Sequence, residues 1–282
     1  MDELNIEQNE ILTGCMLGDG NLVKLYGNQN SAFRVGHCEQ QKEYNEWLCE
    51  KFKPFSLSIT TEKRAKIDGF DKIRNTPIRS KTEFCNICVF RTKKHPIFRK
   101  LEQTWYARNV NGDYLLDKNK RRIKIVPNDI SLTELSLAVW YFDDGTNLHN
   151  TNSKYKQRNA VLHTLAFTTQ ECNILTKEIN KLGINCKVRI NKEKPEIVIL
   201  SCSYFNFIEM VKKYLPCKQL FYKVDLSNYK PPNKRHAAKV NNKTIRKTFR
   251  LLNNKVPQKE IAKILNLGEA TISNIKNGKY NH

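Results

Sequence analysis

The chain has 282 residues and a formal net charge of +21, with 49 Lys and Arg against 28 Asp and Glu. Its hydrophobic fraction of 39% is enough for a packed core, which argues against wholesale disorder. No apolar run is long enough to span a membrane, and the acidic start MDELNIEQNE argues against a secretory signal. We therefore expect an intracellular protein with no membrane contact and a polyanionic partner, most simply nucleic acid. Organelle, bacterial and phage or mobile-element origins all remain open.

The nine cysteines do not predict a disulfide framework, because their number is odd and no secretory signal precedes them. Cys85 and Cys88 form a CxxC pair within the strand-like segment FCNICVF. Residues three apart in a strand face opposite sides, and a second pair at zinc-site spacing is missing. We therefore do not expect a zinc site here.

The first 228 residues repeat one pattern of helices and strands. The first half is predicted to contain a helix, a strand, a helix, a strand and a helix at 10–22, 31–38, 42–52, 84–90 and 95–106. The second half follows with a helix, a strand, a helix, two strands and a helix at 134–147, 160–168, 170–182, 186–190, 196–201 and 204–215. We expect halves of about 1–116 and 130–228, joined by a basic connector at 117–129. A duplication of this kind suggests a pseudo-twofold molecule, which suits a DNA duplex.

The first helix of each half ends in a similar segment, LTGCMLGDG at 12–20 and LAVWYFDDG at 137–145. Apolar residues recur at helical spacing in both segments. Small residues, among them Gly14 and Ala138, would let the two helices approach each other closely.

Parallel packing of these helices would bring Asp19 and Asp144 together at the two C-terminal ends. Like charge and the helix dipoles disfavour that arrangement unless a cation binds. Hard carboxylate oxygens favour Mg²⁺, which takes its other ligands from water and phosphate. An Asp-Gly pair can also simply end a helix. Two copies at equivalent places of a repeat, in a strongly basic chain, favour the metal site.

The two segments resemble the paired motifs of the LAGLIDADG homing endonucleases, in particular the single-chain, two-motif type that the mitochondrial omega intron encodes. The resemblance extends to LNIEQNEILTGCMLGDG, IVPNDI, INCKVRINKEKP and YLPCKQLFYK, and covers roughly residues 4–226. It implies an α+β fold: a pseudo-twofold, duplicated αββαββα domain with two antiparallel saddle sheets that bind the DNA major groove. It also implies Mg²⁺-dependent cleavage of both strands, with two or three ions, leaving 3′ overhangs.

Carried over position by position, the resemblance makes Asp19 and Asp144 the metal-binding, catalytic carboxylates. Lys124 and Lys223 correspond to lysines that would stabilise developing negative charge or orient the attacking water. Asn191 corresponds to a polar residue of the solvent network, and no counterpart for it can be placed in the first half. Without the resemblance, Lys124 is only one basic residue of a loop that would contact solvent or phosphate.

Two further regions are candidates for DNA contact. In the strand CKVRINK, the residues Lys187, Arg189 and Asn191 alternate with apolar ones, as in a sheet that rests on a core and reads bases, although a solvated strand face would look the same. A Pro-containing linker at 229–242 then leads to a basic helix-turn-helix domain at 243–282. Its outward residues suited to bases and phosphates are Thr271, Ser273, Asn274 and Lys276. A helical hairpin for protein contact is the alternative.

The sequence thus predicts a monomeric, site-specific double-strand endonuclease that recognises a long asymmetric DNA target and initiates intron or intein mobility. A non-cutting transcription regulator is one alternative, disfavoured because both motif aspartates are retained. An RNA maturase that assists group I intron splicing is another, with intron RNA as its partner.

Overall fold

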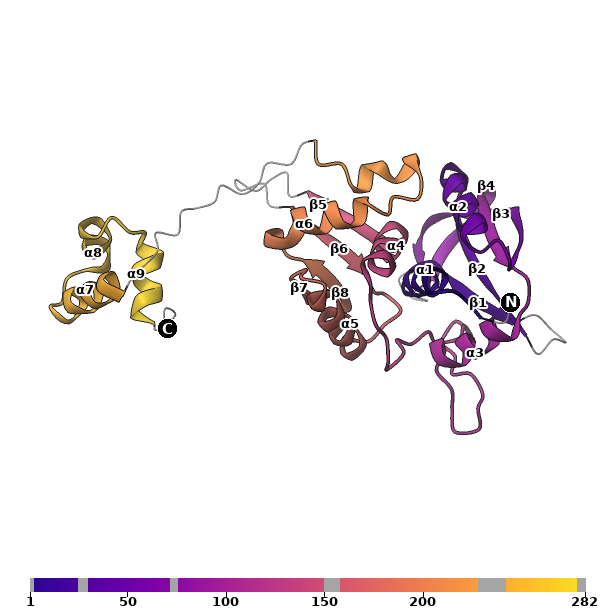
Figure 1. Cartoon of the computed structure of the whole chain (residues 1–282), viewed down its shortest axis with the longest axis horizontal. Coiled ribbons are helices and arrows are strands. Elements are labelled where there is room, and N and C mark those ends of the chain that lie inside the picture. Colours follow the sequence, from indigo (N-terminus) through magenta and orange to yellow (C-terminus); the bar gives the residue numbers. More distant parts are fainter. Residues whose placement is uncertain (1–2, 25–29, 72–75, 150–157, 228–241, 278–282) are drawn as a thin grey trace. The chain divides into compact units, whose positions relative to one another are not determined.

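The computed structural model describes residues 3–24, 30–71, 76–149, 158–227 and 242–277. The chain divides into two compact units, Met1–Tyr229 and Lys230–His282 (Figure 1). The expected linker at 229–242 lies almost wholly outside the described residues. Within the described part of the chain, no helix is both long and apolar enough to cross a membrane.

In the first unit, the order helix, two strands, helix, two strands, helix occurs twice. The first half contains α1 (Ile6–Leu17), β1 (Asn21–Lys24), β2 (Ser31–Cys38), α2 (Lys42–Lys51), β3 (Ser56–Asp71), β4 (Thr76–Thr92) and α3 (Pro96–Trp105). The second half contains α4 (Glu134–Asp144), β5 (Gly145–His149), β6 (Arg158–His163), α5 (Thr169–Lys181), β7 (Cys186–Asn191), β8 (Lys194–Ile199) and α6 (Ser201–Lys212). The α+β class and the duplicated pattern are confirmed.

Each half forms a four-stranded antiparallel sheet, and the strand order is the same in both: β1-β2-β4-β3 and β5-β6-β8-β7. The helices α1 and α4 lie side by side between the two sheets (Figure 1). One face of each sheet joins these helices in a single apolar core, to which Phe33 and Phe90 contribute from the first sheet and Leu162 and Ile197 from the second. The core therefore holds the ends of both motif helices at the centre of the unit.

Gly14 sets the separation of the two motif helices. A Cβ atom at Gly14 would lie 2.5 Å from the Ser136 carbonyl oxygen and 2.7 Å from the Cβ of Val139. Val139, which stands where the family motif has glycine, is fully buried. The valine of α4 is thus accommodated by the glycine of α1, and the predicted close approach occurs at Gly14.

Both motif helices begin at a capping box, formed by Asn5 with Gln8 in α1 and by Thr133 with Ser136 in α4. The capping box starts α1 at Ile6, four residues before the expected helical segment. The helix then ends at Leu17, before the motif aspartate. By contrast, α4 continues through its motif aspartate. The two helices therefore end differently with respect to the candidate site.

The connector between the halves is held to the first half. Its chain folds back on itself through isolated β-bridges, one of which pairs Tyr106 with Lys124. Arg122 donates to the buried carboxylate of Glu102 in α3 and to the carbonyl oxygen of Leu22 in β1. The backbone N–H of Val126 donates instead to Glu171 of α5, 2.8 Å away. Val126, inside the expected connector, is thus already hydrogen-bonded to the second half.

The second unit contains α7 (Asn242–Asn253), α8 (Gln258–Ile264) and α9 (Glu269–Lys276). A small apolar core built on Ile261, Ala262 and Ile272 joins these helices. After α8, the backbone reverses at Asn266, which has φ +48°, and the Leu267 N–H donates to the Ala262 carbonyl oxygen at 2.9 Å. The described residues therefore show two helices joined by a short turn, following a third helix.

The CxxC pair lies in β4. Cys85 is exposed and Cys88 is buried. Their places in the register with β3 are three residues apart, so the prediction that the two thiols face opposite sides of the strand is confirmed.

Candidate active site

Asp19 and Asp144 lie at the adjoining C-terminal ends of α1 and α4. Asp144 is the last residue of its helix, whereas Asp19 follows Gly18, the residue that caps α1. Burial, together with the charges of Asp19 and Asp143, raises the pKa of Asp144 to about 7. Burial and the charge of Asp143 also raise the pKa of Asp19. The structure thus brings both carboxylates into one site that disfavours their charge unless a cation is present.

The two candidate lysines donate to backbone carbonyl oxygens at and just after the ends of these helices. Lys124 Nζ donates to Gly18 O at 3.1 Å and to Gly20 O at 2.8 Å. Burial lowers the pKa of Lys124 to about 8, although Asp144 and Asp19 oppose the shift. The first motif is thus paired with Lys124 from the connector.

Lys223 is the last residue of the short helix Lys218–Lys223, and it binds the end of α4 in the same way. Its Nζ donates to the carbonyl oxygens of Tyr141, Phe142 and Asp143, at 3.2, 2.6 and 3.3 Å. An ammonium group has three hydrogens, so these three acceptors use all of them. Lys124, with two acceptors, keeps one hydrogen for another partner.

A third carboxylate, Asp143, was not among the predicted site residues. Its side chain is fully buried, although it directly precedes Asp144. Asp143 Oδ1 accepts from the Tyr44 hydroxyl at 2.7 Å, and Oδ2 accepts from the backbone N–H of Asp19 at 3.2 Å. The sequence signal was the doubled acid in FDDG, of which only the second was assigned.

His37 is the other buried polar residue that the sequence did not identify. Its Nε2 lies 3.4 Å from Asp143 Oδ1 and 3.7 Å from Asp19 Oδ2. Burial alone would lower the pKa of His37, but the nearby Asp143 carboxylate, with further help from Asn45 and Asp19, raises it. The available signal was its place in SAFRVGHC, where strand alternation sets a histidine on the apolar face with Phe33 and Val35.

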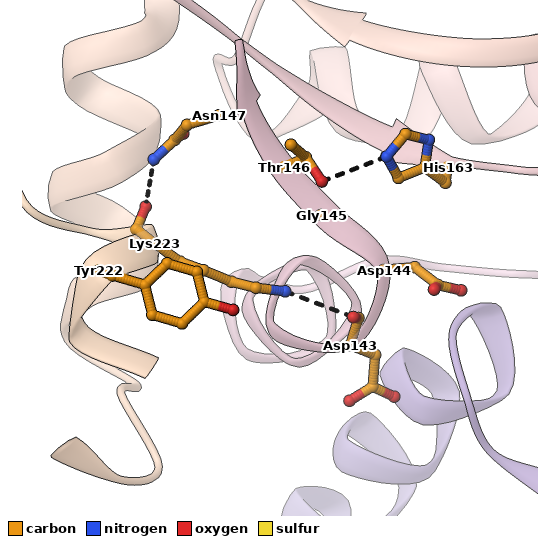
Figure 2. A pocket seen from close by; sticks show the side chains of 8 residues that line it. All are labelled: Asp143, Asp144, Gly145, Thr146, Asn147, His163, Tyr222 and Lys223. Atoms are coloured by element: carbon orange, nitrogen blue, oxygen red, sulfur yellow. Dashed lines mark hydrogen bonds between the residues drawn. The ribbon is translucent and has the colours of Figure 1, made fainter. Parts of the chain in front are cut away.

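Asp144 opens into a pocket of about 390 Å³ that is lined by Asp143, Asp144, Gly145, Thr146, Asn147, His163, Tyr222 and Lys223 (Figure 2). Figure 2 shows the side chains of Asp143 and Asp144 leaving the end of the helix in different directions. His163 and the Thr146 hydroxyl are 3.2 Å apart. A smaller pocket of about 120 Å³ lies beside Lys124 and also reaches Asp144 and His163. The larger pocket is lined mainly by polar residues and has room for water and a phosphate group, whereas Leu17, Leu165 and Phe167 line part of the smaller one.

Comparison with known proteins identifies the family. Residues 9–207 match the model of the LAGLIDADG DNA endonuclease family. Over 211 residues, the chain is 32% identical to the probable intron-encoded endonuclease 1 of Wickerhamomyces canadensis, a match that covers 74% of this chain and 80% of that protein. This chain belongs to the LAGLIDADG DNA endonuclease family. It is therefore a DNA endonuclease by descent.

Two other LAGLIDADG relatives are informative. The chain is 26% identical to the cytochrome b mRNA maturase bI2 of Saccharomyces cerevisiae over 209 residues, which are 70% of this chain and 42% of that protein. Among solved structures, the homing endonuclease I-WcaI bound to its DNA recognition sequence matches with a TM-score of 0.60 and 27% identity. That match covers 80% of this chain and 88% of I-WcaI.

The other predicted site residues of the first unit lie on the second sheet. Lys187, Arg189 and Asn191 are exposed and alternate along β7, and in the register their partners are Val198, Glu196 and Lys194 of β8. Glu196 accepts from both Arg189 and Asn191, each at 2.8 Å. Asn191 lies at the hairpin end and lines neither pocket, so the structure does not place it with the four central candidates.

Strand register also supplies a first-half equivalent of Asn191. Both sheets have the same strand order. In the register of β3 with β4 and of β7 with β8, the pair Thr60–Val89 of the first sheet corresponds to the pair Arg189–Glu196 of the second. Two residues further along β3 stands Glu62, which accepts from Arg34 through both carboxylate oxygens at 2.8 Å. The first-half equivalent of the Asn191 amide is thus the carboxylate of Glu62, which Arg34 binds.

In the second unit, the four candidates all lie on α9. Lys276 is exposed, whereas Thr271, Ser273 and Asn274 are half-buried. Ile272 and Ile275 face the small core.

Proposed function

We propose that this chain is a site-specific, double-strand DNA endonuclease that works with Mg²⁺, leaves 3′ overhangs and initiates the mobility of an intron or intein. The observation that carries the proposal is the convergence of two carboxylates and two lysines at the paired ends of α1 and α4. The proposal is supported by I-WcaI, whose structure was solved on its DNA recognition sequence, and by the intron-encoded relative.

Asp19 and Asp144 are the residues that would hold the metal. Their hard oxygens suit Mg²⁺, and among the described residues no group of three His, Cys, Asp or Glu side chains forms a closed metal site. Two protein ligands leave the other positions of an octahedral ion to water and phosphate. Bound Mg²⁺ would supply an activated water and neutralise charge on the scissile phosphate. The raised pKa values of both aspartates fit this role, because a divalent cation would replace the protons that burial and the neighbouring carboxylates favour.

The lysines would then act as fixed positive charges beside the phosphate. Lys124 has one hydrogen that the two motif carbonyls do not use, so it can donate to a water or a phosphate oxygen. Lys223 is 7% exposed and uses its three hydrogens on backbone carbonyls, so it would act mainly through its charge. One chain supplies both halves, and we therefore infer that a monomer cuts both strands.

DNA contacts would come from the outer faces of the sheets and from the second unit. On β7, Lys187, Arg189 and Asn191 present long hydrogen-bonding side chains on one exposed face. In the second unit, α9 would enter the major groove with Thr271, Ser273, Asn274 and Lys276. The target would be long and asymmetric, because the two halves differ in sequence and the second unit is present once.

The test of the proposed function uses a supercoiled plasmid carrying the uninterrupted insertion site of the element that encodes the chain. With Mg²⁺ the protein should produce linear DNA, and with EDTA it should produce none. Asp19→Asn or Asp144→Asn should abolish double-strand cleavage while DNA binding remains. Asp129→Asn, which removes an exposed carboxylate of the connector, is the matched control and should cut normally. Full cutting by either motif variant would disprove the assignment.

The role of the second unit is tested by a chain that ends at Asn228. This chain should still cut but bind its site more weakly, by about tenfold or more, because a tethered second module raises effective concentration. The difference should shrink at high salt, where basic contacts contribute least. Its footprint should be shorter on one side only. Equal affinities and footprints would show that the second unit does not contact the DNA.

Intron RNA is a second candidate substrate. The observation that favours it is the similarity to cytochrome b mRNA maturase bI2, which extends over 70% of this chain. A maturase role would be seen as faster splicing of the encoding intron in vitro when the protein is added. It would persist in Asp19→Asn, because RNA folding does not need the cleavage carboxylates.

A further inference from the structure

Asp143 belongs to the second half by sequence, but its side chain contacts the first half. The groups that bond to it are the Tyr44 hydroxyl of α2 and the Asp19 backbone N–H. His37 of β2 lies 3.4 Å away, and the Cys15 thiol of α1 also hydrogen-bonds to this carboxylate. The carboxylate therefore crosses from one half of the duplicated domain into the other.

The equivalent position in the first motif cannot do the same. Asp143 precedes Asp144 as Gly18 precedes Asp19, so the two residues are pseudo-twofold equivalents. A Cβ atom at Gly18 would lie 2.5 Å from Asp143 Cβ and 2.9 Å from Asp143 Oδ2. Of these two equivalent positions, only position 143 has room for a side chain, and that side chain supports the site around Asp19.

The backbone at Asp19 requires an external acceptor, whereas the backbone at Asp144 does not. Because α1 ends at Leu17, the N–H of Asp19 lies beyond the regular helix, and Asp143 Oδ2 accepts from it at 3.2 Å. Asp144 is still helical, so its N–H has the usual partner one turn back. The acceptor that the chain supplies for this exposed N–H is the Asp143 carboxylate, which makes Asp143 the group that fixes the position of the Asp19 backbone.

His37 continues this support to the Asp19 side chain. Asn45 Nδ2 donates to Cys88 O at 2.8 Å, which leaves Asn45 Oδ1 to accept from His37 Nδ1 at 2.9 Å. The imidazole is thereby oriented with Nε2 between Asp143 and Asp19, and this nitrogen has no hydrogen-bond partner among the described residues. The ring is also stacked on Tyr44, with centroids 4.5 Å apart.

We propose that Asp143, with His37 and Tyr44, is a positioning residue for the Asp19 centre alone, so that the two strand cleavages depend on different supports. The proposal rests on the proposed nuclease function. Asp144 would be supported separately, through Asn147, which donates to the Lys223 carbonyl oxygen at 2.7 Å and accepts from the Tyr141 hydroxyl.

The first test follows both strands of the cleavage site, each labelled at one end, in single-turnover reactions. Asp143→Ala should slow one strand about tenfold or more relative to the other, as expected for the loss of a charge-assisted acceptor, and nicked DNA should accumulate. Tyr44→Phe, a milder change, should slow the same strand less. Asn147→Ala should shift the ratio of strand rates in the opposite direction. Equal slowing of both strands by Asp143→Ala and Tyr44→Phe would overturn the proposal.

The control for general destabilisation is Ser203→Ala. Ser203 accepts from the Asn185 N–H at 2.9 Å in the second half, is buried, and lies outside the site. This variant should lose stability without changing the ratio of the strand rates. A strand bias in Ser203→Ala would also count against the proposal.

The second test needs neither metal nor DNA. Hydrogen exchange of the Asp19 amide, followed by NMR in EDTA, should be at least about tenfold faster in Asp143→Ala than in Ser203→Ala, because only the former removes the acceptor. Unchanged protection of that amide would overturn the positioning role. If the wild-type protein cuts no DNA, the nuclease assignment fails, while the exchange measurement still decides whether Asp143 holds Asp19.

Discussion

The two motif carboxylates occupy equivalent places in the duplicated fold, yet their surroundings differ. Among the cations that oppose the raised pKa of Asp19, the largest effect comes from His37, whereas for Asp144 it comes from Lys124. Asp19 lies past the end of its helix and depends on an acceptor from the other half. Asp144 lies within its helix and faces an open pocket. The duplication has kept the carboxylate and the lysine of each half, while the supporting residues have diverged.

The outer faces of the sheets differ in the same way. At matching register positions, one sheet has Glu62, which accepts from Arg34, and the other has Asn191, which donates to Glu196. Equivalent backbone positions thus present different donors to whatever lies on the sheets. A protein with two such faces is suited to a target whose half-sites differ.

The largest expected effect comes from removing the lysines. Lys124→Met and Lys223→Met should each slow the single-turnover rate roughly 100-fold, because a fixed charge beside developing negative charge stabilises a transition state by about 3 kcal/mol. Site binding should change little. Lys223 uses all its hydrogens internally, so its replacement tests action through charge alone, whereas Lys124 also tests direct donation.

The contrasting result would be a phosphate anchor. In that case binding would weaken, the salt slope would fall by about one unit, and the single-turnover rate would stay the same. Lys187→Met on the exposed face of β7 is the matched control, for which that second pattern is expected.

A double-mutant cycle can test whether side chains at the equivalent positions 18 and 143 compete for the same space. Gly18→Ala should destabilise the protein by about 1–3 kcal/mol, as overpacking of a close contact does, because its Cβ meets Asp143. In an Asp143→Ala background the same change should cost measurably less in denaturant unfolding. Strictly additive costs would show that the two positions do not compete for space.

The smallest effect concerns the stability of the metal-free protein. The pKa of Asp144 is raised to about 7 in the folded state, so its stabilising contribution is complete at low pH and is lost as the pH rises through 7. In EDTA, Asp144→Asn should therefore raise the Tm at pH 8 and have little effect at pH 4. Each kcal/mol gained corresponds to roughly 2–4 °C for a domain of this size.

Mg²⁺ should reverse the order of the Tm values of the wild type and Asp144→Asn at pH 8. It should stabilise the wild type at pH 8 through linkage and stabilise Asp144→Asn less. Asp19→Asn should show the same pH trend as Asp144→Asn. A Tm gain for Asp144→Asn of the same size at pH 4 and pH 8 would show that the carboxylate is not the cause.

The sequence predicted the fold well where local pattern determines structure. The alternation in SAFRVGHC gave β2 with its exact bounds, and the helical spacing gave α2 and α5 to within one residue. It did not give β3 or the length of β4, because their pairing with each other extends a polar hairpin beyond the apolar core. It also placed the start of α1 too late, because the Asn5–Gln8 capping box precedes the apolar pattern.

The site was only partly predictable, for a different reason. Asp19 and Asp144 were identified because the repeated motif marks them, whereas Lys124 and Lys223 were identified only through the family resemblance. Asp143, His37 and Tyr44 become recognisable only when α2 and β2 are packed against the end of α4, which is tertiary information.

The point at which the chain passes from one half to the other limits how such genes can recombine. The Ile125 N–H still donates to the Trp105 carbonyl oxygen at 2.9 Å, while Val126 is already bonded to Glu171. Lys124 therefore belongs to the first half, whose motif it contacts. A crossover that joins halves from two parents keeps each lysine with its own motif if the junction falls after Lys124 and before α4, and a junction between residues 125 and 126 also leaves these two hydrogen bonds within their own halves. Exchange there would assemble new pairs of half-sites, and so new targets, when the new second half supplies the carboxylate that Asp143 gives to the Asp19 site.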